Sequence, residues 1–149
     1  MLESENIINY NYLKKISGEL PPPLSKEAFI KSFKVNSKGN ANIKTPIKEI
    51  EINADEAWKH LLENSKGEDR TKISGGILST LQKPFFVTRD KARGSYYFYK
   101  PFKDDRGILN LISVEVPKSA RLKYQTSYIG DKNRMLHIIN DYELVYKSW

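Results

Sequence analysis

The chain contains no cysteine and only two histidines among its 149 residues. Without cysteine it can form no disulfide, no thiolate zinc site and no cysteine nucleophile. Two histidines are too few to favour a histidine-based metal site, so we expect neither a metal nor another cofactor. The lack of cysteine fits a cytosolic protein, and it fits equally a protein that unfolds to cross a membrane.

Long apolar runs are also missing. No stretch approaches the roughly 18 apolar residues of a spanning helix, so we expect no membrane span. The N-terminus lacks a basic start followed by an apolar stretch, so no secretory signal is expected. Positive charge is in excess, with a net charge of +7. Such an excess attracts polyanions such as nucleic acids, although a basic protein without any such partner is equally compatible with it.

Composition changes along the chain predict a leader followed by one domain. Residues 1–42 are expected to be a leader or linker with one short helix, which Ser25 would cap. The three prolines at residues 21–23 favour an extended conformation, and the Gly/Asn/Ser-rich residues 36–42 favour a loop. The compact domain is expected to span residues 43–149.

Two helices are predicted at the start of this domain. The alternation in IKEIEI predicts a strand, and Asn53 with Glu56 resembles a capping box that opens a helix over residues 54–64. Ala54, Trp58, Leu61 and Leu62 would share its buried face. A second helix is expected over residues 69–82, before Pro84. The glycine pair at residues 75–76 weakens it, and either a close crossing or a bend would explain that pair.

The second half of the domain predicts a sheet. Segments rich in β-branched and aromatic residues alternate with turn signals, which favours an antiparallel meander. The strands are predicted at residues 85–89, 95–100, 108–116 and 122–129. The tail, residues 134–149, is compatible with a strand or a helix. The predicted fold class is α+β, with N-terminal helices packed on a twisted antiparallel sheet of four or more strands.

Two residues of the predicted helices could take part in catalysis. His60 points away from Trp58, so it lies on a solvated face unless another segment covers it, and histidine is suited to move protons near neutral pH. Arg70 continues an apolar stripe, so it either extends to the rim or points towards a cleft, where its guanidinium would suit a phosphate. His137 is a second candidate, but its apolar neighbours favour packing.

Two predicted strands carry further candidates. Tyr96 shares a strand face with Lys100, and aromatic residues beside lysines can stack bases and pair with phosphates. Thr126 and Tyr128 share one face of a later strand, and Ser127 lies on the other. Their hydroxyls could bind a phosphate. Strand propensity alone also accounts for these residues.

The order of these features resembles the phage- and toxin-associated branch of the barnase–EndoU–colicin D–RelE-like nucleases. The resemblance covers about residues 42–130: NIKTPIKEIEI, a helix with His60, Arg70 opening the next helix, ILSTLQKPFFV, a Tyr-rich strand ending in Lys100, and TSY in a late strand. It implies helices packed on a four-stranded antiparallel sheet. It also implies a metal-independent endoribonuclease that cleaves RNA, with tRNA as one candidate, through attack of the 2′-hydroxyl. The products would be a 2′,3′-cyclic phosphate and a 5′-hydroxyl.

The resemblance also implies roles for residues. His60 would be the acid–base residue, Arg70 and Lys100 the cations on the phosphate, and Thr126 or Ser127 the orienting hydroxyl. The residues expected to bind the substrate are Arg89, Tyr96 and Tyr128. EndoU enzymes use two neighbouring histidines and barnase a late one, so the division of acid and base roles stays open here.

A toxin of this kind implies a monomer that acts in a bacterial cytoplasm, delivered by a larger protein or made in the cell. It would also need an acidic immunity protein or antitoxin as partner. Two alternatives remain open from the sequence. One is a non-catalytic RNA-binding module, and the other is a phage structural or adaptor domain.

Overall fold

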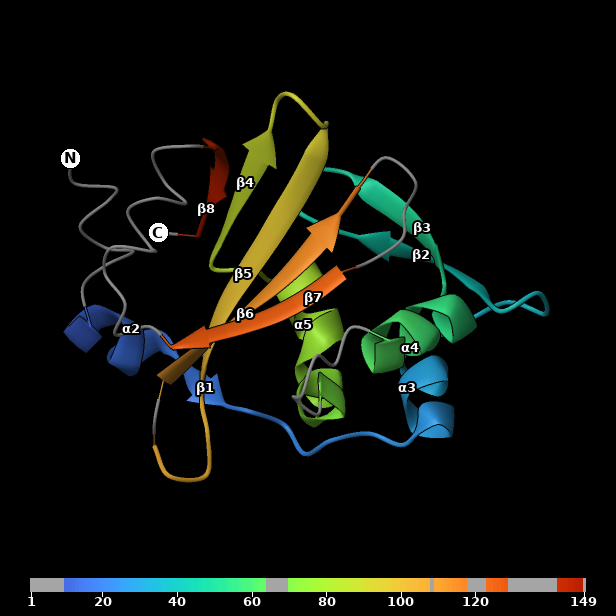
Figure 1. Ribbon diagram of the computed structural model, residues 1–149, viewed down its shortest axis with the longest axis horizontal. Coiled ribbons are helices and arrows are strands. Elements are labelled where there is room, and N and C mark those ends of the chain that lie inside the picture. The colour runs from blue at the N-terminus through green and yellow to red at the C-terminus, as the bar shows by residue number, and fades with distance from the viewer. Residues whose placement is uncertain (1–9, 64–69, 108, 118–122, 129–141, 149) are drawn as a thin grey trace.

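A computed structural model describes residues 10–63, 70–107, 109–117, 123–128 and 142–148 of the chain. Its centre is a sheet with helices packed against it (Figure 1). The predicted α+β class is therefore confirmed. Within the described ranges, no helix is both long and apolar enough to cross a membrane. His137 lies outside these ranges.

The sheet is an antiparallel meander with two additions. Four consecutive strands pair in sequence order: β4 (Phe86–Asp90), β5 (Ser95–Lys103), β6 (Leu109–Val116) and β7 (Lys123–Tyr128). The tail supplies β8 (Glu143–Lys147), which pairs antiparallel with β4 and forms the edge opposite β7. Short β1 (Gly18–Glu19) runs parallel to the end of β5. The predicted meander is therefore confirmed. Of the two structures compatible with the tail, a strand is the one that residues 143–147 form.

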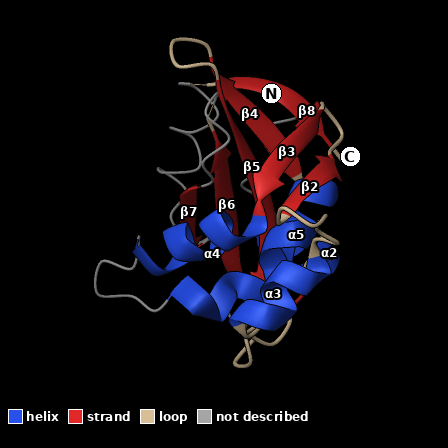
Figure 2. Cartoon of the chain, turned by 90° about the vertical axis from the view of Figure 1, so that its right-hand side faces the viewer, coloured by secondary structure: helices blue, strands red, loops and turns tan. Residues whose placement is uncertain are grey.

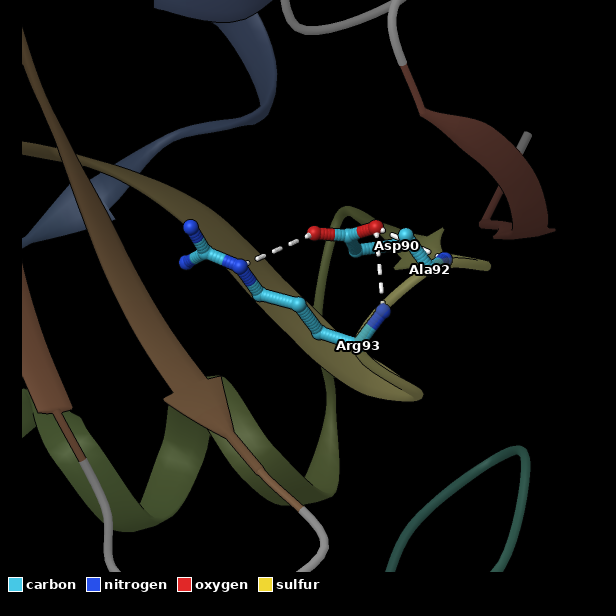
Figure 3. A network of polar contacts seen from close by, with 3 residues as sticks. All are labelled: Asp90, Ala92 and Arg93. Carbon is cyan, nitrogen blue, oxygen red and sulfur yellow. Dashed lines mark hydrogen bonds and ion pairs between the residues drawn. The ribbon is translucent and has the colours of Figure 1, made fainter.

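The turn between β4 and β5 fixes the register of these two strands. One carboxylate oxygen of Asp90 accepts hydrogen bonds from the backbone N–H groups of Ala92 and Arg93, and the other lies 3.8 Å from Arg93 Nε (Figure 3). Gly94 closes the turn with a positive φ of 71°, a conformation that favours glycine. The resulting register sets Arg89 opposite Tyr96.

A layer of helices covers one face of the sheet (Figure 2). It contains α3 (Lys26–Ser32), α4 (Ala54–Glu63), the 3₁₀ helix η1 (Arg70–Gly76) and α5 (Ile77–Gln82). The hairpin of β2 (Asn40–Lys44) and β3 (Glu49–Asn53) joins the same side, and α5 contacts β2, β5 and β6. Residues 40–42, predicted as loop, belong to β2.

The predicted helix caps are present. Ser25 Oγ accepts a hydrogen bond from the N–H of Ala28, and Asn53 Oδ1 accepts one from the N–H of Glu56. Ala54 and Leu61 are buried as expected on the inner face of α4. Leu62 is 48% exposed, so its predicted burial was wrong. It lies about 100° round the helix from Leu61, beyond the reach of the core.

The second predicted helix is divided into η1 and α5, because its glycine pair lies against other segments. A Cβ at Gly75 would overlap the backbone oxygen of Pro22, and one at Gly76 would lie 3.0 Å from Ile112 Cδ1. Ser74 Oγ also accepts a hydrogen bond from the N–H of Leu24 at 2.7 Å. Close approach of other segments therefore accounts for both glycines: the proline run crosses at Gly75, and Ile112 of β6 packs against Gly76.

The described part of the predicted leader, residues 10–42, contains more structure than one short helix, which corrects that prediction. Residues 10–42 form α2 (Tyr10–Ile16), β1, α3 and the start of β2. Leu13 is fully buried, and Phe29 and Phe33 are buried in the main core. The physical reason is that each segment is short but contributes one or two large apolar side chains to cores built mainly by later residues.

The two faces of the sheet contact different cores. Phe98 and Phe102 of β5 lie in the core beneath the helix layer. Tyr99 and Leu111 lie in a smaller core on the other face, which Leu13 of α2 completes. Because strand residues alternate between faces, Lys100 shares the helix-covered face with Phe98 and Phe102.

Candidate functional site

Lys100 is the predicted site residue with the most defined surroundings. It extends from β5 towards α5, and its Nζ donates a hydrogen bond to Ser79 Oγ at 2.5 Å. The same Nζ lies 5.7 Å from the centre of the Phe102 ring. The side chain is half-buried. Strand alternation places this cation on the core-facing side, and Ser79 supplies a polar partner there.

The surroundings of Lys100 disfavour its charged form. Burial, and secondly the nearby ammonium group of Lys83, lower the pKa of Lys100 below its ordinary value. Lys83 follows the end of α5, and its backbone N–H donates to the carbonyl of Ser79 at 2.8 Å. Ser79, Lys83 and Lys100 therefore form one polar group, which we call the Lys100 cluster.

Strand register relates Lys100 to the predicted hydroxyl residues. Lys100 pairs with Ile112, and Ile112 pairs with Thr126, so these positions form one row across three strands. Thr126 lies two strands from Lys100, or roughly 10 Å. Ser127 pairs with Leu111 and belongs to the row of the opposite face. The backbone register therefore favours Thr126 over Ser127 as a neighbour of Lys100, and Tyr128 shares the parity of Thr126.

His60 lies on α4 and is partly covered. Its side chain is 21% exposed, and its Nε2 lies 3.7 Å from Glu56 Oε2, one turn earlier on the helix. The helix contacts β7, β3, α3 and η1. His60 is thus neither a core residue nor fully solvated, and it lies on the helix that neighbours the strand of Thr126.

Arg70 opens η1, which contacts both α4 and α5. Its backbone position thus lies in the segment between the helix of His60 and the helix above Lys100. Its side chain, like those of Thr126, Ser127 and Tyr128, lies outside the described part of the structure. The element of Arg70 therefore lies between α4, which bears His60, and α5, which lies over Lys100, and α4 also contacts β7, which bears Thr126.

Arg89 and Tyr96 form a separate group at the far end of β5. They are cross-strand partners, and the guanidinium carbon of Arg89 lies 5.8 Å from the centre of the Tyr96 ring. Lys48 of the β2–β3 connection lies 4.7 Å from the same ring centre. Tyr96 is four residues from Lys100, or roughly 13 Å along the strand. Two cations gathered on one ring favour phosphate contacts over base stacking.

Tyr97 and Tyr99 of β5 lie on the opposite face of the sheet from Lys100. Burial, followed by the charge of Glu115, raises the pKa of Tyr97 to about 12. Its ring stacks on Tyr142 with centres 5.1 Å apart. Burial also raises the pKa of Tyr99, which stacks on Phe86. These tyrosines are therefore kept protonated and packed, and they are structural.

No sequence pattern selected Ser79, Lys83 or Lys48 as site residues. Ser79 and Lys83 are spaced one helical turn apart, which would have indicated a shared helix face. Their relation to Lys100 depends on where α5 crosses β5. Among the described side chains, no three His, Cys, Asp or Glu residues are grouped in a way that could hold a metal ion.

The chain matches no protein-family model, no curated protein and no solved structure. The roles of these residues therefore depend on their chemistry and arrangement alone.

Proposed function

We propose that this protein is a metal-independent endoribonuclease in which His60, Arg70, Lys100 and Thr126 act on one phosphate of RNA. The observation that carries the proposal is the half-buried Lys100 ammonium on the helix-covered face, bound to Ser79 and in the strand row of Thr126. Further support comes from η1, the element of Arg70, which contacts both α4, the helix of His60, and α5, the helix over Lys100. A fold alone does not decide activity.

The reaction would use the 2′-hydroxyl of RNA as nucleophile. The hydroxyl oxygen bonds to the adjacent phosphorus after losing its proton to a base, and the bond to the 5′-oxygen breaks as an acid supplies a proton. His60 is our candidate for one of these proton transfers. Lys100 would stabilise the charge that develops on the phosphate oxygens, and a partly desolvated cation does this more strongly than a solvated one.

The test is incubation of the full chain with tRNA and total RNA in EDTA. Wild-type protein should cut both or one of these RNAs, and His60→Ala and Lys100→Met should each lower the rate on the order of 10²-fold or more. Lys59→Ala on the same helix and Lys103→Met on the same strand are matched controls that should leave the rate unchanged. Intact RNA with wild-type protein would count against the proposal.

A non-catalytic RNA-binding module is the alternative that a specific observation favours. Lys48 and Arg89 lie over the partly buried ring of Tyr96, away from the Lys100 cluster. Such a surface binds phosphates without chemistry. This alternative predicts salt-dependent RNA binding without cleavage. It also predicts that His60→Ala leaves the RNA affinity unchanged.

Partners follow from the same proposal. RNA would be the substrate, and a toxin that cuts RNA in its own cell would be held inactive by an acidic immunity protein or antitoxin. Such a partner would cover the elements that carry Lys100 and Arg70. Co-expression of a candidate acidic protein should restore growth of cells that make the wild-type chain.

A further inference from the structure

The Lys100 cluster has the composition of an anion site rather than of a structural ion pair. We infer that Ser79, Lys83 and Lys100 together bind one phosphate group, and that Ser79 and Lys83 are therefore binding residues which the sequence did not indicate. The inference deepens the proposed function, because there the phosphate belongs to the RNA. The site itself can be tested without any cleavage.

The geometry brings Lys100 and Ser79 together, and the backbone of Lys83 is bonded to the same residue, Ser79. Ser79 and Lys83 lie one turn apart at the end of α5, and the backbone bond between Lys83 N and Ser79 O at 2.8 Å keeps that turn closed. Lys83 is the C-cap residue of α5, and its charge lies close enough to disfavour the charged form of Lys100. Lys100 approaches from the sheet below, with its Nζ 2.5 Å from Ser79 Oγ.

Charge balance indicates that something negative belongs there. Lys83 and Lys100 are near enough for the first to disfavour protonation of the second. Among the residues that the structure describes, neither lysine makes an ion pair with an acidic side chain. Two neighbouring ammonium groups, one of them half-buried, repel each other without a counter-charge. A bound anion would remove that repulsion.

Hydrogen-bonding capacity also remains unused. Ser79 Oγ accepts the bond from Lys100, so its own O–H is left to donate to a ligand. An ammonium group has three donors, and the Lys100 bond to Ser79 uses one of them. Ser79 therefore orients the Lys100 ammonium and adds a neutral donor beside it. A tetrahedral oxyanion such as phosphate can accept from all three side chains at once.

The direct experiment is titration of the full chain with inorganic phosphate, followed by calorimetry and by the thermal unfolding midpoint. Chloride at matched ionic strength is the reference for non-specific screening. Phosphate should bind and raise the unfolding temperature beyond the effect of chloride. Ser79→Ala and Lys100→Met should each weaken phosphate binding about 10- to 100-fold. Lys103→Met and Lys91→Ala should bind as the wild type does.

Lys83→Met tests the same site at a surface position, so it keeps the experiment decisive even if Lys100→Met fails to fold. It should also weaken phosphate binding. Phosphate effects equal to those of chloride, or undiminished binding by both Ser79→Ala and Lys83→Met, would overturn the inference.

An RNA arm separates this inference from the proposed function. A short RNA with 2′-O-methyl groups cannot be cleaved through its 2′-oxygen, and it should compete with inorganic phosphate if the site receives RNA. Phosphate binding without competition or RNA cleavage would preserve the site and reject the nuclease. Cleavage of ordinary RNA that is unaffected by Ser79→Ala and Lys83→Met, with no phosphate binding, would reject the site and preserve the nuclease.

Discussion

A lysine on the core-facing side of a sheet needs a partner or a ligand to compensate for its charge. The alternation of SYYFYK was enough to predict the strand and the face of Lys100, because side chains in a strand repeat every two residues. Ser79 could not be predicted as its partner. That contact depends on where α5 crosses β5, which no local pattern encodes.

Histidine placement was predicted in part. The helical wheel placed His60 off the core face of α4, and the structure agrees that it lies outside the core. Its 21% exposure was not predictable, because a helical wheel does not show how other elements pack around the helix. The position of His60 alone does not separate a solvated residue from a functional one. The RNA digestion with His60→Ala decides between these two roles.

Tyr97 offers a prediction about pH that is independent of RNA. Its pKa, raised by burial to about 12, exceeds the value of about 10 in an unfolded chain. A raised folded pKa contributes stability that is fully present below the unfolded pKa and is lost as pH rises towards the folded pKa. The free energy of unfolding should therefore fall between about pH 9 and about pH 11.

Urea unfolding at these two pH values, for wild type and Tyr97→Phe, checks this expectation. The variant should lose less stability on alkaline transfer, because it has one fewer phenol to ionise. Part of the loss in free energy of unfolding should remain in the variant, because burial also raises the pKa of Tyr99. An equal loss in both proteins would show that Tyr97 does not contribute.

At the scale of elements, the break between η1 and α5 is set by a contact distant in sequence. The glycine pair showed that either a crossing or a bend was needed. The identity of the crossing segment, Pro22, was not accessible from local sequence. Pro22 and Gly75 are more than fifty residues apart, so their contact is known only from the three-dimensional structure.

Gly75→Ala tests this crossing. The added methyl group would overlap the backbone oxygen of Pro22, so either the proline run or η1 must shift. We expect a destabilisation of about 1–3 kcal/mol, measured as a lower urea midpoint at unchanged slope. Gly18→Ala is the matched control, because a Cβ there meets nothing within 4 Å. Equal midpoints for Gly75→Ala and wild type would contradict the crossing.

At the scale of the whole molecule, the meander was predictable because successive strands with short links pair with their neighbours. The leader was not. A seven-residue helix such as α2 has too few turns to show a clear apolar period. Its buried residue Leu13 packs in a core with residues more than seventy positions later in the chain. Local patterns therefore indicated a linker where the structure has part of the core.

The variant Leu13→Ala measures how much the packing of α2 against the sheet contributes to stability. Leu13 is fully buried against the second face of the sheet, and its truncation should cost about 2–5 kcal/mol in free energy of unfolding. Ile16 lies on the same helix and is 42% exposed, so Ile16→Ala should cost far less. Similar costs for the two variants would indicate that α2 does not dock as described.

The central claim is that this protein cleaves RNA through the 2′-hydroxyl at a phosphate held by Lys100. The most direct measurement is end-group analysis of RNA digested in EDTA, with a matched substrate carrying a single 2′-deoxy nucleotide at the cut position. We predict 2′,3′-cyclic phosphate and 5′-hydroxyl ends, no cut at the deoxy position, and loss of cleavage in Lys100→Met. Uncut RNA, 3′-hydroxyl ends, or unchanged cutting by Lys100→Met would contradict the claim.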